Sequence, residues 1–332
     1  MTLKDDTYYV QGVLDRDKRI IAKTITLIES SLAQHQKVAR RVINHLLPHT
    51  GKAVRLGISG VPGAGKSTFI ESLGTLLVAK SHRVAVLAVD PSSKRSGGSV
   101  LADKTRMEKL SVAENAFIRP SPSGGTLGGV ARKTRETMLV CEAAGYDVMI
   151  VETVGVGQSE ITVASMVDFF LLLMIAGAGD ELQGIKKGVL EVADAIAVNK
   201  ADGDNIDRAE RAAKQYENAL HYLIPTSTIW SPKVMTCSSL AAGNAGIIKI
   251  WETVLEHRRR HVESGALDRK RQDQALDWMW SLLEEGLKER FFGNPKIVAR
   301  LPQIKRSVKN GETAPTVAAD ELLFSLDNQE VL

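Results

Sequence analysis

Residues 60 to 67 read Gly-Val-Pro-Gly-Ala-Gly-Lys-Ser, a spacing of glycines, lysine and serine that can bind a phosphate chain. An apolar run at residues 54–59 precedes this segment, and a segment with helical character at 68–80 follows it. Glycines let backbone N–H groups turn inward around phosphate oxygens, and the N-terminus of a following helix adds a positive end. In this strand–loop–helix context the pattern predicts a nucleotide-binding P-loop, and the alternative is an ordinary Gly-rich turn.

Two side chains of this loop carry the expected chemistry. Lys66 should reach the outer phosphates, and the Ser67 hydroxyl should ligate Mg²⁺. The backbone of the loop should supply further nucleotide contacts, from Gly60, Gly63, Ala64 and Gly65.

Residues 199–202, Asn-Lys-Ala-Asp, follow the apolar run 195–198 and match the guanine-reading element of G proteins. The Asp202 carboxylate can accept hydrogen bonds from both N1–H and the 2-amino group of guanine, whereas adenine offers no such pair of donors. A site built around such bonds can reject the wrong base by about 10⁴. Asn199 and the stem of Lys200 would brace the base and the P-loop. A solvated turn is the alternative, but a P-loop upstream favours guanine binding.

A third segment, Thr-Cys-Ser-Ser-Leu at residues 236–240, loosely resembles the fifth G-protein motif, whose backbone touches guanine O6. This interpretation adds Ser238 and Ser239 to the expected nucleotide contacts. A plain strand end remains an equally good reading of the segment.

Three acids follow or lie near apolar runs between these motifs, and they suggest a magnesium region. Asp90 ends the run 84–89, Glu152 ends the run 147–151, and Asp103 lies between them. Mg²⁺ takes only one or two carboxylates directly and keeps several waters, so all three cannot be direct ligands. At least one acid should orient a water or act as a base, and for each the alternative is a solvated charge. The candidate metal ligands are Ser67, Asp90, Asp103 and Glu152, and the candidate catalytic residues are Lys66, Asp90, Asp103 and Glu152.

Glu152-Thr153-Val154-Gly155 takes the place of the Asp-x-x-Gly motif, so the Gly155 N–H should sense the γ-phosphate. Ras-like proteins place a glutamine directly after this glycine to orient the attacking water. Here that position is Val156, and Gln158 comes two residues later. We therefore expect slow intrinsic GTP hydrolysis that a partner accelerates.

Taken together, these segments resemble the MeaB/ArgK family, the methylmalonyl-CoA mutase-associated G proteins of the signal-recognition, MinD and BioD-like branch. The resemblance covers about residues 15 to 330. It implies a homodimeric GTPase that serves as a chaperone of an adenosylcobalamin-dependent methylmalonyl-CoA mutase, gating cofactor delivery and protecting or reactivating the mutase. It rests on the segments 60–67, 90–93, 97–99, 103–107, 152–160, 183–188 and 199–202.

The resemblance also implies roles for individual residues. The nucleotide contacts of the family fall on Lys66, Ser67, Thr68, Asn199 and Asp202. Its Mg²⁺-region acids fall on Asp90, Asp103 and Glu152. Its mobile loop, which reports the nucleotide state to the mutase, falls near residues 178–188 and contains Asp180, Gln183, Lys186 and Lys187. The residues themselves agree in kind, since the Gly-rich segment 176–180 follows a strand end, although a flexible surface loop is the alternative.

Composition narrows the class of protein. The 332 residues carry a net charge of +4, too small to indicate nucleic-acid binding. The two cysteines, Cys141 and Cys237, form no Cys-x-x-Cys pattern and should be buried small hydrophobes in a reducing compartment. The N-terminus lacks an apolar signal region, and the apolar run 169–176 is too short to span a bilayer. We therefore expect a cytoplasmic protein with no membrane contact. The basic cluster 258–261 should be a solvated helix face rather than an anion site.

The pattern of elements predicts an α/β fold of the P-loop NTPase class, with a mostly parallel sheet flanked by helices. We expect an N-terminal helical arm (1–48), a GTPase domain (49–264) and a C-terminal helical dimerisation region (265–332). In the last region Leu276, Met279, Leu283, Leu287 and Phe291 recur at helical spacing as an apolar stripe. The resembled family dimerises through such helices, and packing onto the sheet of the same chain is the alternative.

Two other functions remain open. A nickel-insertion GTPase of the same branch is disfavoured because the seven histidines are scattered and no Cys-x-x-Cys occurs. A small-molecule kinase of the transport-kinase type would need a second pocket with an acceptor base. Labelled GTP would separate the kinase from the GTPase, because the phosphate would end on a metabolite rather than on water.

Overall fold

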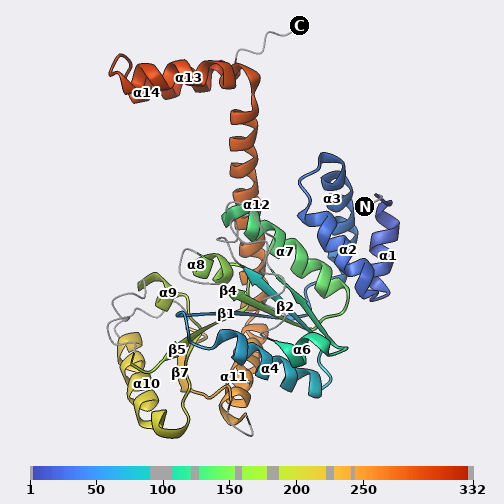
Figure 1. Cartoon of the computed structure of the whole chain (residues 1–332), viewed down its shortest axis with the longest axis vertical. Coiled ribbons are helices and arrows are strands. Elements are labelled where there is room, and N and C mark those ends of the chain that lie inside the picture. Colours follow the sequence, from blue (N-terminus) through green and yellow to red (C-terminus); the bar gives the residue numbers. More distant parts are fainter. Residues whose placement is uncertain are drawn as a thin grey trace. The chain divides into compact units, whose positions relative to one another are not determined.

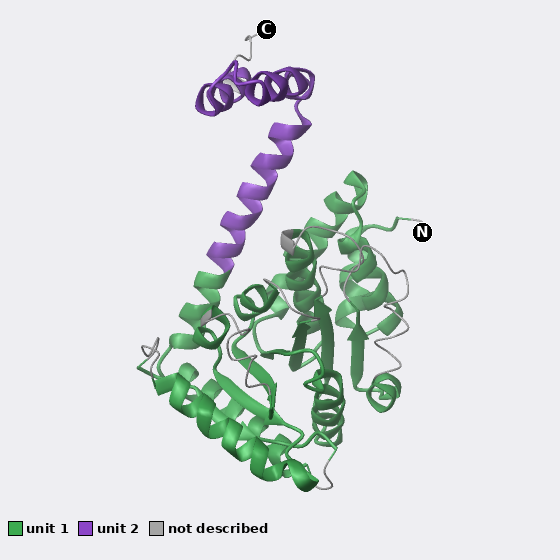
Figure 2. Ribbon diagram, turned by 60° about the vertical axis from the view of Figure 1, so that its left-hand side comes forward, with its two compact units in different colours: residues 1–274 green, residues 275–332 purple. Residues whose placement is uncertain are grey.

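The structure is a computed structural model, and it describes residues 3–89, 107–120, 127–153, 159–177, 187–221, 228–240 and 244–327. The chain divides into two compact units, residues 1–274 and 275–332 (Figure 2). The domain boundaries expected near residues 48 and 264 stay predictions.

A parallel sheet forms the centre of the first unit (Figure 1). Within the described residues it has seven strands, in the order β3-β2-β4-β1-β5-β6-β7. Every paired neighbour runs parallel. The strands are β1 (Val54–Gly60), β2 (Val84–Val89), β3 (Ala116–Arg119), β4 (Val148–Thr153), β5 (Phe169–Ile175), β6 (Ala195–Asn199) and β7 (Lys233–Thr236). The predicted mostly parallel α/β fold is confirmed.

Helices precede, connect and follow these strands. Those of the first unit are α1 (Asp6–Leu14), α2 (Lys18–Glu29), α3 (Ala33–Leu46), α4 (Lys66–Ala79), α6 (Glu108–Val112), α7 (Leu127–Ala143), α8 (Ser159–Ala164), α9 (Lys187–Glu191), α10 (Ile206–His221) and α11 (Ala245–Glu263), with short 3₁₀ turns at η1 (Leu47–His49) and η4 (Gly203–Asn205). The helix α12 (Ala266–Gly293) begins in the first unit and ends in the second. Among the described residues, no helix has both the length and the apolar character needed to cross a bilayer.

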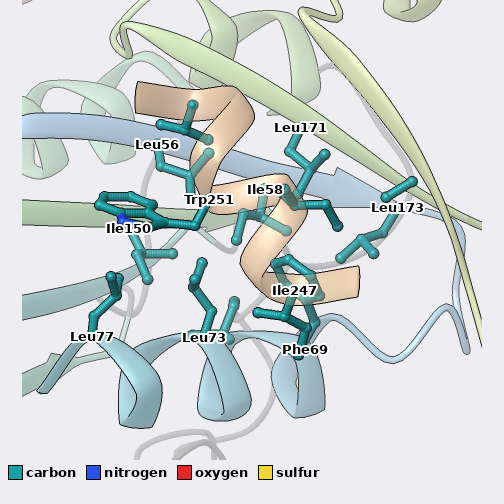
Figure 3. Packing of buried hydrophobic residues seen from close by; sticks show 14 of the residues in the cluster. Leu56, Ile58, Phe69, Leu73, Leu77, Ile150, Leu171, Leu173, Ile247 and Trp251 are labelled. Carbon is teal, nitrogen blue, oxygen red and sulfur yellow. The ribbon is translucent and has the colours of Figure 1, made fainter. Parts of the chain in front are cut away.

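Strand β5 shows why the sheet is buried on both faces. Successive side chains of a strand point to opposite sides. Phe169, Leu171 and Leu173 accordingly enter one core, whereas Phe170 and Leu172 enter a second. Figure 3 shows the first of these cores, in which helices α4 and α11 cover β1 and β5. Its labelled side chains are Leu56, Ile58, Phe69, Leu73, Leu77, Ile150, Leu171, Leu173, Ile247 and Trp251. Burying each such side chain contributes about 1.5–3 kcal/mol, so this core fixes α4 firmly against β1.

The first three helices pack on the rest of the first unit. Tyr9, Ile21 and Val42 of the arm are fully buried, and they share a cluster with Val140 and Cys141 of α7. An ion pair between Glu29 and Arg119 joins the arm to the end of β3. The arm is therefore packed on the sheet and its flanking helix.

Buried charges gather at the amino ends of β1 and β5. We call Arg55, Glu142, Asp168, Arg258 and Arg271 the amino-edge cluster. Arg271 donates to both carboxylate oxygens of Asp168, at 2.9 and 2.7 Å. Arg55 donates its backbone N–H to Asp168 at 2.9 Å and its side-chain Nε–H to Glu142 at 2.6 Å. Arg258 lies 3.6 Å from Asp168 and also binds the backbone carbonyls of residues 52 and 53.

The cluster attaches α11 and the start of α12 to the sheet. Asp168 is only 2% exposed. Burial opposes its ionisation, but the hydrogen bonds and charge of Arg271, with a smaller effect of Arg55, outweigh burial and hold the pKa of Asp168 below its usual range. Burial also acts on Arg271, yet the bonded Asp168 carboxylate raises the pKa of its guanidinium. Each partner therefore stabilises the charged form of the other.

The second unit contains the end of α12 together with α13 (Pro295–Lys309) and α14 (Pro315–Asp327). Ile297 and Ala318 are buried in it, and Arg300 of α13 pairs with Glu321 of α14. The predicted apolar stripe lies on α12, and Leu276, Met279, Leu283 and Leu287 are 54%, 49%, 48% and 56% exposed. The helical prediction for this region is confirmed.

Candidate nucleotide-binding site

The P-loop runs from the carboxyl end of β1 to the first turn of α4, as the sequence predicts. At Gly60 a Cβ atom would lie 2.1 Å from the carbonyl oxygen of Leu173, so only glycine lets the loop leave β1 so close to β5. Gly65 is the N-cap of α4 and has a φ of +83°, a left-handed conformation that favours glycine. The loop therefore turns directly into the helix N-terminus, where backbone N–H groups are available to an anion.

Lys66 lies at this helix start and folds back over the loop. Its Nζ donates hydrogen bonds to the carbonyl oxygens of Gly60 at 2.8 Å and Val61 at 3.3 Å. Burial lowers the pKa of Lys66, while the charges of Glu152 and Glu160 act in the opposite direction. A partly desolvated ammonium beside a helix N-terminus is well placed to bind phosphate oxygens.

Ser67 and Glu152 come together beside Lys66. The Ser67 hydroxyl donates to Glu152 Oε1 at 3.3 Å, and Glu152 is 6% exposed at the end of β4. A hydroxyl next to a carboxylate supplies oxygen ligands, the type that Mg²⁺ prefers. Among the described residues no group of three or more His, Cys, Asp or Glu is placed to hold a metal ion. The Ser67 hydroxyl and the Glu152 carboxylate thus fit the oxygen ligands of a magnesium ion.

The loop after β6 meets the P-loop at the same edge of the sheet. Asn199 is 1% exposed, and its Nδ2–H donates to the carbonyl oxygen of Ala64 at 2.8 Å. Lys200 has a φ of +60°, which is strained for a side chain of this size, and Asn205 holds its carbonyl oxygen with a 2.7 Å hydrogen bond. Such strain at a loop that leaves a buried strand is typical of a binding site.

The segment after β7 completes this edge. The Ser238 hydroxyl donates to the Asp202 carboxylate. The backbone N–H of Ala201 binds the carbonyl oxygen of Cys237 at 2.9 Å, so the two loops are held side by side. The Ser238 hydroxyl therefore orients the Asp202 carboxylate. Cys237 of the same segment is buried, as predicted, and burial raises the pKa of its thiol to about 12, so the thiol stays protonated.

The structure gathers many of the predicted site residues at the carboxyl edge of the sheet. Those for which it gives positions are Gly60, Gly63, Ala64, Gly65, Lys66, Ser67, Thr68, Glu152, Asn199, Lys200, Asp202, Ser238 and Ser239. Asp90, Asp103, Gly155, Asp180, Gln183 and Lys186 lie outside the described residues, as does the side chain of Lys187. Binding and catalytic roles for all of these residues stay predictions.

Two residues near this edge were not singled out from the sequence. Glu160, 9% exposed at the start of α8, influences the pKa of Lys66. Ser72 of α4 donates to the carbonyl oxygen of Ser239 at 2.8 Å. The sequence could not predict the contact between Ser72 and Ser239, because the two residues lie 167 positions apart.

Comparison with known proteins adds independent findings. The family model described as "Methylmalonyl Co-A mutase-associated GTPase MeaB" matches residues 21–296. A protein of Caulobacter vibrioides is 56% identical over 307 residues, which cover 92% of this chain and 93% of that one. GTPase ArgK of Escherichia coli is 47% identical over 313 residues and 94% of each chain. A crystal structure of an LAO/AO transport system kinase superposes with a TM-score of 0.79 at 39% identity, covering 98% of this chain and 100% of that one.

Proposed function

The chain belongs to the MeaB family of methylmalonyl-CoA mutase-associated GTPases, and from this premise we propose that it binds and hydrolyses GTP as a chaperone of an adenosylcobalamin-dependent mutase. The observation that carries the GTP part is the hydrogen bond from Asn199 to Ala64. This bond joins the loop expected to read guanine to the loop expected to bind phosphates. One nucleotide can therefore occupy both loops at once.

Base selectivity provides the first test. With Mg²⁺ present, calorimetry should show GTP binding far more tightly than ATP, because adenine cannot satisfy the Asp202 carboxylate. Asp202→Asn exchanges one acceptor oxygen for an N–H donor, which suits the 2-oxo group of xanthine better than the 2-amino group of guanine. We expect this variant to prefer XTP over GTP. ATP binding as tight as GTP binding in the wild-type protein would refute the proposal.

Hydrolysis would draw on the residues beside the P-loop. Lys66 would stabilise the charge that develops on the phosphate oxygens, and Glu152 with Ser67 would hold the ion region. Magnesium, when bound, would supply charge neutralisation at the β- and γ-phosphates. Asp90 and Asp103 are proposed for the same region, and the Gly155 N–H would contact the γ-phosphate. Because Val156 occupies the position of the water-orienting glutamine, turnover by the protein alone should be slow and should rise when the partner binds.

The proposed partner is a methylmalonyl-CoA mutase, and the segment containing Asp180, Gln183, Lys186 and Lys187 is proposed to report the nucleotide state to it. The family description supports a mutase partner for the family. Capture of a B12-dependent mutase should differ between the GDP form and the form with a non-hydrolysable GTP analogue. Equal capture would remove the differential affinity that gating requires.

A kinase activity is the second candidate, because the solved relative at 39% identity carries the name of a transport system kinase. Incubation with γ-labelled GTP and candidate small-molecule acceptors distinguishes the two reactions. We expect the label to be released as inorganic phosphate. Label on a metabolite would favour the kinase.

We also propose a homodimer formed through α12. Leu276, Met279, Leu283 and Leu287 leave an apolar stripe about half exposed on this helix, and exposed apolar patches mark association sites. Sedimentation should show a dimer at micromolar concentration. The double variant Leu283→Glu, Leu287→Glu should be monomeric, whereas Glu284→Gln on the same helix should stay dimeric. A monomeric wild-type protein would contradict this proposal.

A further inference from the structure

Ser72 stands out because its hydroxyl reaches from the P-loop helix to the segment after β7. Two nearby residues of α4, Phe69 and Leu73, are buried in the core. The Ser72 Oγ–H donates to the carbonyl oxygen of Ser239 at 2.8 Å. Ser239 is 7% exposed, so this bond forms in a largely water-excluded position where a lost partner is costly.

Ser239 continues the connection towards Asn199. Its backbone N–H and its hydroxyl both donate to Asn199 Oδ1, at 3.2 and 2.9 Å. The Cys237 thiol lies 3.5 Å from the same oxygen. Because Oδ1 faces these donors, the Nδ2 end of the amide must face the other way, where it donates to Ala64 at 2.8 Å. The orientation of the Asn199 amide is thus set by the network around it.

The bonds close a ring that joins the P-loop and α4 to the segments after β6 and β7. The ring passes from Ser72 to Ser239, from Ser239 to Asn199, from Asn199 to Ala64, and back along the chain from the P-loop into α4. P-loop and Asn199 also touch, since a Cβ at Gly65 would lie 2.9 Å from Asn199 Nδ2. Buried networks of this kind act as units and hold a single arrangement.

From this ring we infer that Ser72 and Ser239 are positioning residues for guanine recognition, an inference that rests on the proposed GTP function. Ser238, whose hydroxyl orients the Asp202 carboxylate, directly precedes Ser239 in the chain. Anchoring the carbonyl oxygen of Ser239 therefore limits how far Ser238 and Asp202 can shift. The effect of Ser72 should fall on discrimination between bases, because the P-loop backbone contacts to phosphates do not depend on it.

The test compares GDP with inosine diphosphate, which lacks only the 2-amino group of guanine. In the full-length protein, Ser72→Ala should narrow the preference for GDP over inosine diphosphate by about two- to fivefold, at most the effect of one ordinary hydrogen bond. Ser72→Thr keeps the hydroxyl and should restore the wild-type ratio. Thr75→Ala removes an exposed hydroxyl three residues further along α4 and should leave the ratio unchanged.

A double variant shows whether the two serines act together. Ser239→Ala removes one of the two hydrogen bonds that Ser239 donates to Asn199. This variant should also narrow the preference for GDP over inosine diphosphate. The combined Ser72→Ala, Ser239→Ala variant should lose less than the product of the two single effects, because both residues belong to one network. If the effects of the two single variants on this preference simply multiplied in the double variant, Ser72 and Ser239 would not act through one network.

The outcomes separate this inference from the function on which it rests. If wild-type protein binds GDP no better than ADP, the proposed function fails and this inference fails with it. If wild-type protein prefers GDP and Ser72→Ala weakens GDP and inosine diphosphate equally, or lowers only the melting temperature, Ser72 is merely structural and the inference alone is overturned.

Discussion

At the carboxyl edge of the sheet Lys66 and Asn199 hold the backbone of the P-loop, whereas at the amino edge oppositely charged side chains pair with one another. Lys66 binds the carbonyl oxygens of Gly60 and Val61, and Asn199 binds that of Ala64. In the amino-edge cluster, by contrast, Asp168 and Arg271 join two full charges through two hydrogen bonds. Both edges belong to the same strands, so burial of charge by itself does not identify a binding site.

The difference shows in the pKa shifts. At the amino edge the bonded partners favour the ionised forms, so the pKa of Asp168 falls and that of Arg271 rises. At the carboxyl edge burial lowers the pKa of Lys66 and so disfavours its charged form. A phosphate would reverse that penalty, because an anion stabilises the ammonium. The Asp168–Arg271 pair thus stabilises its own charges, whereas Lys66 is placed to gain from an anionic ligand.

The largest expected effect is on stability, at the amino edge. Asp168→Asn leaves Arg271 and Arg258 without their shared anion, and breaking such a buried pair costs about 3–5 kcal/mol. Urea unfolding should show this loss, while the folded variant should bind GDP with nearly wild-type affinity. Asp268→Asn, an exposed acid one turn before Arg271, should change stability by no more than about 0.5 kcal/mol. If Asp168→Asn lost GDP binding but kept wild-type stability, the proposed difference between the two edges would be wrong.

Lys66→Met should strongly reduce GTP hydrolysis and barely change stability, the reverse of what we expect for Asp168→Asn. Hydrolysis should fall by about 10²–10³-fold, the usual effect of removing one preorganised electrostatic contact to a transition state. The free energy of unfolding should stay within about 1 kcal/mol of wild type, because the cost of burying the Lys66 ammonium offsets the hydrogen bonds that it donates to two carbonyl oxygens. Lys80→Met, at the exposed end of α4, should leave both quantities unchanged. A large loss of stability in Lys66→Met would contradict the contrast between the edges.

Acid should weaken the amino edge selectively. The pKa of Asp168 in the folded protein lies below the unfolded value of about 3.9, so its stabilisation is fully present above that pH and is lost as pH falls through the folded pKa. The pKa of Asp194 is lowered in the same way. Burial opposes the ionisation of its carboxyl, but the interactions with His257 and Lys270 outweigh burial. The stability difference between wild type and Asp168→Asn should therefore be constant from about pH 5 to 8 and shrink below about pH 4. If the stability difference between wild type and Asp168→Asn grew below about pH 4, the lowered pKa of Asp168 would be contradicted.

The carboxyl edge was largely predictable from the sequence because its residues lie in short contiguous motifs. Residues 60–67 and 199–202 each carry their residue types next to one another, and each follows a recognisable apolar strand. Parallel strands bring their carboxyl ends to one edge, so the meeting of these motifs could be expected. Contacts such as that between Ser72 and Ser239 could not, because they join an unremarkable helix position to a segment 167 residues away.

The amino edge left almost no signal in the sequence. Its members come from five separate elements or loops, and each one alone resembles an ordinary surface charge. The cluster 258–261 was expected to be a solvated helix face. Arg259 does pair with Glu263 of its own helix, but Arg258 reaches Asp168 and His261 is buried. Only the three-dimensional arrangement of the strands and α11 brings these charges together.

The smallest effect is expected where the amino edge meets solvent. His82 Nδ1 lies 2.7 Å from Asp147 Oδ2, a distance as short as those in the buried cluster, but the Asp147 side chain is 52% exposed. Exposed contacts between polar or charged side chains contribute only about 0–1 kcal/mol because water competes for both partners. His82→Gln should therefore lower stability by less than about 1 kcal/mol in urea unfolding. A loss as large as that of Asp168→Asn would mean that short contact distance, and not burial among mutually bonded charges, sets the stability of this edge.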